Sequence, residues 1–199
     1  MGYRLVSLLL SFGVVVGVAL LGGCGKEIGD ACIVGSDCSP NGDRLCDPSS
    51  VGGYCTIQGC DYSTCPEEAA CVRFFTGSFL NRTCDPAKTA ALCSKDPADC
   101  CSLDELCSIM TIEGEAEDIK GHCVPRSSEV RYCMRTCDSD GDCRDGYECR
   151  DLAKMKEHGG EPVLASGQVI SSDGNVIGSN GLKTDEQLAK FCAATPATP

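Results

Sequence analysis

The chain has 199 residues, of which 19 are cysteine and none is tryptophan, and a formal net charge of −12. The reducing cytosol rarely supports about one cysteine in ten residues. The composition therefore indicates either an oxidising compartment or a metal–sulfur protein. The negative charge argues against nucleic acid as a partner, because binding nucleic acid needs a basic surface. The length allows one domain or a few very small ones.

The first 23 residues have the pattern of a secretory signal. Arg4 is their one charge, and residues 5–23 are uncharged and mostly apolar. A short positive start, an apolar run and a small-residue ending are typical of a signal peptide. This run is also nearly long enough to cross a bilayer, so a permanent anchor helix is the alternative interpretation.

The end of this leader resembles the lipobox of bacterial lipoproteins. Leu21-Gly22-Gly23-Cys24 supplies an aliphatic residue, two small residues and the cysteine that carries the lipid in that family. The resemblance implies cleavage after Gly23, diacylglycerol on the Cys24 sulfur and acylation of the new N-terminus, which together anchor a protein stably to the bilayer. Gly25 stands where aspartate retains family members in the inner membrane, which implies the outer membrane. We therefore expect an exported, lipid-anchored protein of the cell envelope.

Cleavage after Gly23 would change the formal charge from −12 to −13, because the leader contains Arg4 and no acid. Lipidation uses one of the 19 cysteines and leaves 18, an even number that predicts nine disulfides and no free thiol. Large aliphatic residues, methionine and phenylalanine are scarce after the leader, which would suggest disorder without cross-links. We expect disulfides, each worth about 2–4 kcal/mol, to replace much of the missing core.

The cysteines recur at similar spacings, which predicts small stapled modules in a row. After a lipidated N-terminus and linker at residues 24–31, we expect three modules within residues 32–132, a fourth within 133–192 and a flexible tail at 193–199. Cys100 and Cys133 are left over, and they could bridge the third and fourth units. The four predicted units are Cys32, Cys38, Cys46 and Cys55; Cys60, Cys65, Cys71 and Cys84; Cys93, Cys101, Cys107 and Cys123; and Cys137, Cys143, Cys149 and Cys192.

Two other groupings of the cysteines compete with this one. Cys46 and Cys84 each begin the same spacing, Cys-Asp-Pro-x6-Cys. The cysteines from Cys84 to Cys123 follow the C–C–CC–C–C order and so resemble cystine-knot peptides, although their last gap, after Cys107, is long for that family. The sequence leaves the connectivity open, since the number of pairings rises steeply with the number of cysteines.

The remaining patterns predict a small disulfide-rich protein with a loop-rich α+β fold. Residues 86–94 are predicted to form a short helix, with Asp85 as its N-cap and proline at its first position. Residues 102–110 are predicted to form another. The C-terminal module is expected to contain a hairpin and a helix.

The predicted hairpin spans residues 162–178, where short apolar runs alternate with Ser-Gly and Asp-Gly turns. The predicted helix begins with a capping box at residues 184–187 and places Leu188 and Phe191 on one face. Cys192 would then link this helix to the body of the protein.

Signatures of metal–sulfur and catalytic sites are missing from the sequence. There is no C-x2-C pair, the spacing on which structural zinc sites, most iron–sulfur sites and thioredoxin-type redox sites depend. The adjacent Cys100 and Cys101 could be redox-active if bridged to each other, but separate partners are the favoured interpretation. His122 and His158 are the two candidate bases, His158 lies in a polar stretch typical of exposed surface, and no nucleophile motif accompanies either. The sequence therefore predicts no enzyme.

Calcium is the best ion hypothesis. Asp138, Asp140 and Asp142 place carboxylates at alternate positions, as loops that bind hard cations do. The segment is not an EF-hand, because Cys143 and Cys149 stand where glycine and glutamate are required. An acidic turn between two disulfides is the favoured interpretation, so no cofactor is predicted.

The same segment resembles the opening of the Dickkopf-type cysteine-rich domain. The resemblance rests on Cys137-x5-Cys143-x5-Cys149, with Asp142 before the middle cysteine and Gly146 near the last. It covers only the segment from Cys137 to Cys149 and implies an extracellular, stapled, protein-binding module. Taken as a whole, the lipobox and the Asp- and Gly-rich cysteine repeats are similar to cysteine-rich lipoproteins of myxobacteria.

These observations predict a non-catalytic role in binding, adhesion or structural support at the cell envelope. Rigid, stapled loops suit recognition because little conformational entropy is lost on binding. The expected partners are the lipid bilayer, through Cys24, and a basic or envelope protein attracted by the acidic surface. A protease inhibitor is the first alternative function, and a redox protein or enzyme is the second.

Overall fold

The computed structural model describes residues 25–77, 82–112, 115–116 and 118–196, and within them all regular elements are short. The helices are α1 (Gly35–Cys38), α2 (Ala90–Cys93) and α3 (Leu152–His158), with 3-10 turns η1 (Arg126–Ser128) and η2 (Asp140–Asp142). The strands are β1 (Leu45–Asp47), β2 (Tyr54–Thr56), β3 (Ala69–Phe75), β4 (Glu105–Ser108), β5 (His122–Pro125), β6 (Glu129–Arg135), β7 (Tyr147–Arg150), β8 (Glu161–Pro162), β9 (Val169–Ile170), β10 (Val176–Ile177) and β11 (Phe191–Ala194). The predicted fold class, a small disulfide-rich and loop-rich α+β protein, is confirmed.

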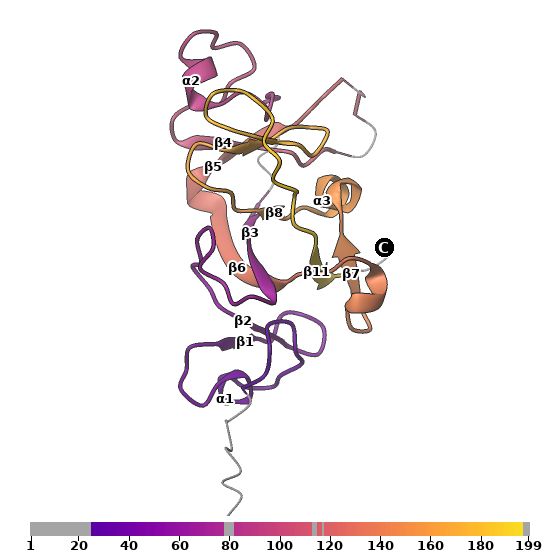
Figure 1. Ribbon diagram of the computed structural model, residues 1–199. Coiled ribbons are helices and arrows are strands. Elements are labelled where there is room, and N and C mark those ends of the chain that lie inside the picture. The colour runs from indigo at the N-terminus through magenta and orange to yellow at the C-terminus, as the bar shows by residue number, and fades with distance from the viewer. Residues whose placement is uncertain (1–24, 78–81, 113–114, 117, 197–199) are drawn as a thin grey trace, which may run out of the picture.

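The elements are stacked along one long axis (Figure 1). The β1–β2 hairpin and α1 form one end, and the β4–β5 hairpin and α2 form the other. The three-stranded sheet β6–β3–β8 lies between them, with the β7–β11 pair beside it. Each sheet among the described residues is antiparallel and has two or three strands, so none of these sheets organises this part of the chain alone.

The central sheet carries most of the hydrophobic core. β3 and β6 pair over seven residues, with Cys71 opposite Cys133, and Val72 is completely buried at the centre of β3. Met155 of α3 and Phe191 of β11 are also completely buried in the same cluster. Each such side chain contributes about 1.5–3 kcal/mol by leaving water. The core therefore joins segments from the whole described chain.

Residues 25–31 belong to the folded body, where a linker was expected. Ile28 is completely buried, and the Gly29 N–H donates to the Cys55 carbonyl at 2.9 Å. The Arg135 guanidinium lies 3.0 Å from the Glu27 carboxylate. These contacts tie the N-terminal segment both to β2 and to the central sheet.

The predicted count of nine disulfides is confirmed for the 18 cysteines between residues 25 and 196. In the first and the fourth predicted unit, the four cysteines form two disulfides with one another. These four bridges are Cys32–Cys46, Cys38–Cys55, Cys137–Cys149 and Cys143–Cys192.

The two middle units differ from the prediction. Cys65 pairs with Cys133, 68 residues further along the chain, so the expected bridge between Cys100 and Cys133 does not form. The physical reason is that antiparallel pairing of β3 with β6 brings Cys133 beside the loop that carries Cys65, a contact that local spacing does not encode. The other bridges here are Cys60–Cys71, Cys84–Cys107, Cys93–Cys100 and Cys101–Cys123.

The cystine-knot grouping is also not formed. In the order of that motif, the first cysteine pairs with the fifth, the second with the third and the fourth with the sixth. The bridge between the second and third, Cys93–Cys100, closes a local loop with a sequence separation of 7 and links no other segment. An interlocked knot therefore has no counterpart in this part of the molecule.

The two helices predicted in the third module are wrong in extent or in kind. α2 begins four residues later than predicted, at Ala90, with Thr89 as its N-cap, and Asp85 instead stabilises the turn before it by accepting from the Ala87 N–H at 3.0 Å. Residues 102–110 contain a turn and β4, because Cys107 pairs across the strands with Cys123 of β5. Tertiary pairing here overrides local helix propensity.

The C-terminal predictions are confirmed in part. The hairpin within residues 162–178 is present as β9 and β10, and Cys192 links this region to Cys143. The predicted helix after Thr184 is not formed, because the Thr184 N–H and hydroxyl both donate to the Val176 carbonyl and hold the chain extended. β11 then continues two residues beyond Cys192 and pairs with β7, so the first residues of the expected tail are ordered strand.

Candidate functional site

A pocket of about 300 Å³ lies where three parts of the chain meet: the first cysteine module, the central sheet and β11. It is the candidate functional site, since pockets of this size with apolar walls and a few polar groups are where proteins bind ligands. The residues that line it are Asp47, Ser50, Tyr54, Thr56, Phe74, Tyr132, Met134, Arg150, Ala193 and Ala194.

The walls of the pocket are mainly aromatic. Tyr132 and Met134 alternate with Cys133 along β6, so both point to the face of the sheet opposite to that cysteine. Phe74 lies diagonally across from Tyr132 in the register of β3 and β6, and their ring centroids are 6.5 Å apart. Diagonal neighbours of this kind are within reach of aromatic side chains. The alternation of side chains along the strands therefore places Phe74, Tyr132 and Met134 in one continuous apolar wall.

A glycine makes room for the aromatic cluster behind this wall. Phe74 packs edge-on against Phe191, with ring centroids 6.2 Å apart. A Cβ on Gly160 would lie 2.8 Å from both rings, and Gly160 has φ of +84°, which side-chain-bearing residues rarely adopt. Any larger residue at this position would displace Phe74 and so change the shape of the pocket.

Tyr54 forms the wall opposite the sheet. Its hydroxyl donates to the Cys192 carbonyl at 3.3 Å and accepts from the Arg135 N–H at 3.0 Å. Burial raises the pKa of Tyr54 to about 12, so the hydroxyl remains protonated. These two hydrogen bonds fix the ring between the first module and the C-terminal strand.

Tyr54 also separates this pocket from a second one of about 270 Å³. There the Tyr54 ring stacks on Tyr147 with centroids 5.4 Å apart, and the Arg144 guanidinium lies 4.2 Å from the Tyr147 ring centroid. The second pocket is more polar, because Arg135 and Asp142 also line it. It is a weaker candidate for an apolar ligand.

A buried charge network supports the floor of the first pocket. Arg150 is 6% exposed and donates from Nε to Glu148 at 3.0 Å, from Nη1 to the His158 and Gly159 carbonyls, and from Nη2 to the Ala194 carbonyl at 2.9 Å. Burial lowers the pKa of Arg150 from its ordinary value, and the hydrogen bond to Glu148 opposes that shift. Arg150 thus couples α3, β7 and β11 to the pocket.

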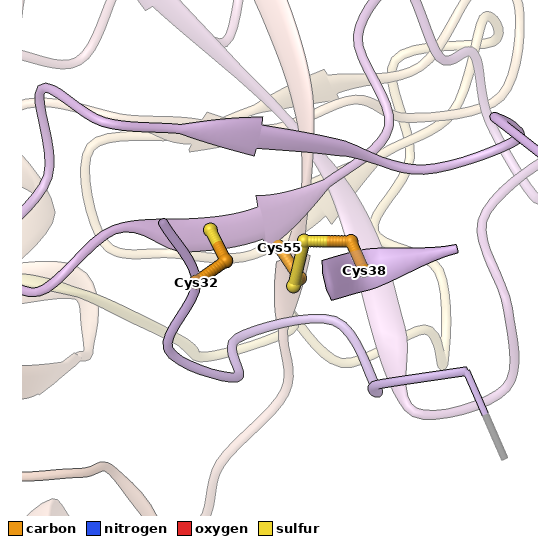
Figure 2. Close-up of side chains that lie close together, drawn as sticks. All are labelled: Cys32, Cys38 and Cys55. Atoms are coloured by element: carbon orange, nitrogen blue, oxygen red, sulfur yellow. A yellow bond between two sulfur atoms is a disulfide. The ribbon is translucent and has the colours of Figure 1, made fainter. Parts of the chain in front are cut away.

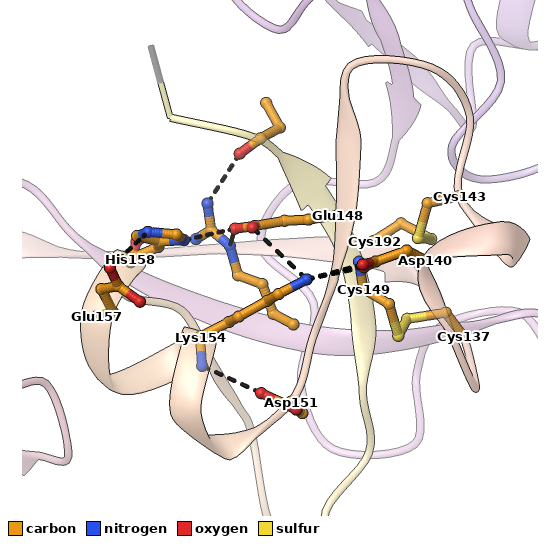
Figure 3. Close-up of polar contacts among 12 residues, drawn as sticks. Cys137, Asp140, Cys143, Glu148, Cys149, Asp151, Lys154, Glu157, His158 and Cys192 are labelled. Atoms are coloured by element: carbon orange, nitrogen blue, oxygen red, sulfur yellow. Dashed lines mark hydrogen bonds and ion pairs between the residues drawn. A yellow bond between two sulfur atoms is a disulfide. The ribbon is translucent and has the colours of Figure 1, made fainter. Parts of the chain in front are cut away.

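α3 supplies the rest of this network (Figure 3). Figure 3 shows His158 and Lys154 approaching Glu148, and Lys154 extending to Asp140. The His158 Nδ1 atom lies 2.7 Å from Glu148, and Lys154 Nζ lies 2.8 Å from Asp140. His158 is half-buried, whereas its polar sequence context predicted an exposed side chain. The network is a structural support for β7.

The calcium candidates serve as caps of a turn in this structure. Asp142 accepts from the backbone N–H groups of Asp138 and Ser139 at 3.0 and 2.8 Å, and Asp140 accepts from the Cys149 N–H at 2.8 Å. Hydrogen bonds from Ser139 lower the pKa of Asp142, and the hydrogen bond from Lys154 lowers that of Asp140. These carboxylates do not converge on one point, as groups of close ligand atoms among the described residues consist of cysteines alone.

The cysteine groups are cross-links. Figure 2 shows Cys38 and Cys55 joined by a disulfide with Cys32 beside them, and Cys32 is bonded to Cys46. The other three groups, around Cys65, Cys101 and Cys143, are likewise formed by cysteines in disulfides. Cys100 and Cys101 have separate partners, as the sequence favoured. A disulfide sulfur is not the thiolate that metals require.

The two histidines lie apart, and neither of them lines either pocket. His122 is 2% exposed on β5, with its Nε2 atom 2.8 Å from Glu115, whereas His158 belongs to the network on α3. Neither forms a hydrogen bond with a serine or threonine hydroxyl among the described residues.

The sequence analysis did not find the pocket residues. The available signal was the alternation of side chains in 129–135, which contains Tyr132 and Met134, whereas Phe74 lies in 69–75, a mostly apolar run without such alternation. The leader, the lipobox residues Leu21, Gly22 and Gly23, and Cys24 lie outside the described residues. In the part of the chain that the structure describes, no helix has both the length and the apolar character needed to cross a membrane.

Comparison of the chain with known protein families, curated proteins and solved structures finds no match.

Proposed function

We propose that this chain is a lipid-anchored protein of the cell envelope that binds a partner through the pocket between its first module, its central sheet and β11, without catalysis. The observation that carries the proposal is the composition of this pocket. Tyr54, Phe74, Tyr132 and Met134 offer apolar walls, and Arg150, which is paired with Glu148, lies buried beside them. The nine disulfides support an oxidising location outside the cytoplasm.

The size of the pocket limits what it can hold. A volume of about 300 Å³ is at the lower end for ligand pockets, and it suits a compact aromatic or branched aliphatic group. The occupant that we propose is an apolar side chain of a partner protein. The walls belong to segments cross-linked by disulfides, so they lose little entropy when the group enters.

The surface charge acts on the approach of the partner. The part of the chain after Gly23 carries a charge of −13, obtained from −12 by removal of Arg4. Such a surface attracts basic partners and speeds their association at low salt. The pocket then supplies the specific contact, which depends on apolar burial and is less sensitive to salt.

Binding of an apolar aromatic probe with one anionic group, 1-anilinonaphthalene-8-sulfonate, tests the pocket. Ala194→Leu fills the pocket from β11 and leaves the backbone carbonyl that Arg150 uses intact. We expect probe fluorescence with the parent protein and at least about tenfold weaker binding with Ala194→Leu, since about 1.4 kcal/mol is lost. Leu182→Ala removes an exposed leucine elsewhere and should bind the probe normally. Equal binding by both variants would contradict the proposal.

The anchor is tested separately, by growth with labelled palmitate. The lipobox resemblance implies that Cys24 carries the acyl groups, so Cys24→Ala should abolish the label. Label that persists in the Cys24→Ala variant would refute the anchor and leave the pocket unaffected.

One observation favours protease inhibition as a second candidate. Leu103 is 99% exposed on a turn directly after Cys101, and Arg126 supports this turn by donating to the Leu103 carbonyl at 3.0 Å. A rigid, stapled loop with a protruding side chain is what an inhibitor offers to a protease. Slow, saturable cleavage after Leu103 by a protease that prefers leucine would support this function, and rapid cleavage without inhibition would reject it.

A further inference from the structure

The end of the molecule that bears α1 presents two apolar side chains to solvent. Ile33 is 87% exposed and Val34 is 52% exposed, although the chain is poor in large apolar residues. They form the centre of an uncharged run, residues 31–36. Scattered apolar residues on a surface need no explanation, but two adjacent ones in the middle of an uncharged run form a compact apolar tip.

The loop holds this apolar tip, Ile33 and Val34, in a fixed position. Cys32, immediately before it, is bonded to Cys46 of β1. The backbone N–H groups of Ile33 and Val34 both donate to the Asp37 carboxylate, at 2.8 and 3.1 Å. These bonds turn the one acidic group of the loop toward its own backbone and lower the pKa of Asp37. Ile33 and Val34 can therefore contact a partner surface without a loss of conformational entropy in the loop.

The proposed anchor leaves the body beside the same loop. A Cβ built on Gly25 would lie 3.2 Å from the Cys38 carbonyl, at the end of α1, and Cys24 precedes Gly25 directly. Consecutive Cα atoms are about 3.8 Å apart, so lipid on Cys24 begins within one residue of the folded surface. Figure 1 shows that the described chain starts at the α1 end, opposite to β4, β5 and α2.

A short and packed attachment restricts how the body can lie on a membrane. Ile28 is fully buried just after the anchor, so residues 25–31 cannot act as a flexible spacer. We propose that the apolar tip is a second membrane contact, inserted among the lipid headgroups, and that the molecule stands with its α1 end against the bilayer. The apolar faces of interfacial helices insert about 5–10 Å, to the boundary between headgroups and acyl chains, and the tip is expected to approach the same boundary. This proposal rests on the lipid anchor proposed above.

The orientation has a consequence for binding. The pocket begins with Asp47 and Tyr54 of the first module, and the β4–β5 end lies further along the axis. The first module therefore acts as a base that raises the pocket above the headgroups, and the turn before β4 that carries Leu103 lies toward the end remote from the membrane.

Tryptophan fluorescence tests the proposal, because the chain contains no tryptophan of its own. Ile33→Trp places a single reporter at the tip, and Leu103→Trp places a matched reporter at an equally exposed position before β4. The acylated proteins, purified from membranes, are reconstituted into phosphatidylcholine vesicles with or without lipids brominated near the headgroup. We expect Ile33→Trp to shift to shorter wavelength and lose most of its emission on brominated vesicles, and Leu103→Trp to remain unchanged.

The outcomes separate this proposal from the anchor. If neither protein floats with the vesicles, the anchor itself fails. If both proteins float but quenching at the two positions is equal, the anchor stands and the membrane contact of the tip is refuted. Val34→Trp provides a second reporter beside the first, and intact mass confirms that each variant retains nine disulfides.

Discussion

The long-range bridge between Cys65 and Cys133 should be worth more to stability than a local one. Replacing both cysteines with alanine removes the bridge without leaving a free thiol. Replacing Cys93 and Cys100 with alanine removes a bridge of the same chemistry that closes a short loop, so it is the matched control. Both double variants keep the other eight disulfides, nine minus one.

The expected difference follows from the lengths of the two loops. The Cys65–Cys133 bridge spans 68 residues, for which the loss of chain entropy gives about 4 kcal/mol. The remaining bridges shorten the path between these cysteines in the unfolded chain, but halving a loop changes its closure free energy by only about 0.6 kcal/mol. The Cys93–Cys100 bridge spans 7 residues and gives about 2.5 kcal/mol. Cys133 is also completely buried, so its truncation adds a cavity term.

Urea unfolding of the oxidised proteins, followed by circular dichroism, measures this difference. The Cys65→Ala, Cys133→Ala variant should lose at least about 1 kcal/mol more free energy of unfolding than the control variant. Equal losses, or a larger loss in the control, would refute the view that cross-links between distant segments replace a large core. A pairing other than Cys65 with Cys133 would appear as free thiols or scrambled bridges in a peptide map of the parent protein.

Three further predictions concern packing and charge. A Cβ on Gly53 would lie 1.9 Å from the Cys32 carbonyl, so Gly53→Ala should lower the free energy of unfolding by more than about 2 kcal/mol. Gly42→Ala, which has open space and a similar φ, should lower it by about 1 kcal/mol, and equal effects would contradict the clash. The pKa of Tyr54 is raised from 10.0 to about 12, so its contribution to the free energy of unfolding is intact below pH 10 and is lost as pH rises toward 12. If the free energies of unfolding of the parent protein and Tyr54→Phe depend on pH in the same way in this range, this prediction is wrong. The Glu161 side chain is 2% exposed in an ion pair, so Glu161→Gln should cost about 3 kcal/mol in urea unfolding, and a neutral result would show that the pair contributes nothing.

Local patterns in the sequence predicted the features that depend on nearby residues. The spacing around Cys32 and around Cys137 identified two units whose cysteines pair only within their own unit, although the Cys143–Cys192 bridge spans 49 residues. The Asp-Gly turn near Gly174 marked the β9–β10 hairpin because glycine permits its φ of +80°. The even number of cysteines predicted nine bridges without any knowledge of the fold.

Features that depend on distant segments were not predictable in this way. Cys133 meets Cys65 because β3 pairs with β6, and no spacing rule contains that pairing. The helix expected after Thr184 does not form, because Thr184 donates hydrogen bonds to the Val176 carbonyl. Residues 102–110 form a turn and β4 instead of a helix, because β4 pairs with β5. Tertiary contacts of this kind outweigh propensities of a few tenths of a kcal/mol per residue, about 0.7 at most.

The candidate site was missed for the same reason. Tyr54, Phe74 and Tyr132 come from three strands that are distant in sequence, and each alone reads as an ordinary core residue. Nothing in the sequence indicated that Arg150 is buried at the pocket, because its burial depends on the packing of α3 and β11 around it. Only Asp138, Asp140 and Asp142 formed a visible motif, and the structure uses Asp140 and Asp142 as caps.

The intact mass of the protein purified from membranes tests the account most directly. The account predicts a chain that begins at Cys24, carries a diacylglyceryl group and an amide-linked acyl chain, and lacks 18 hydrogen atoms because nine disulfides have formed. A chain that retains residues 1–23 without lipid, or one that gains mass on thiol alkylation before reduction, would contradict it.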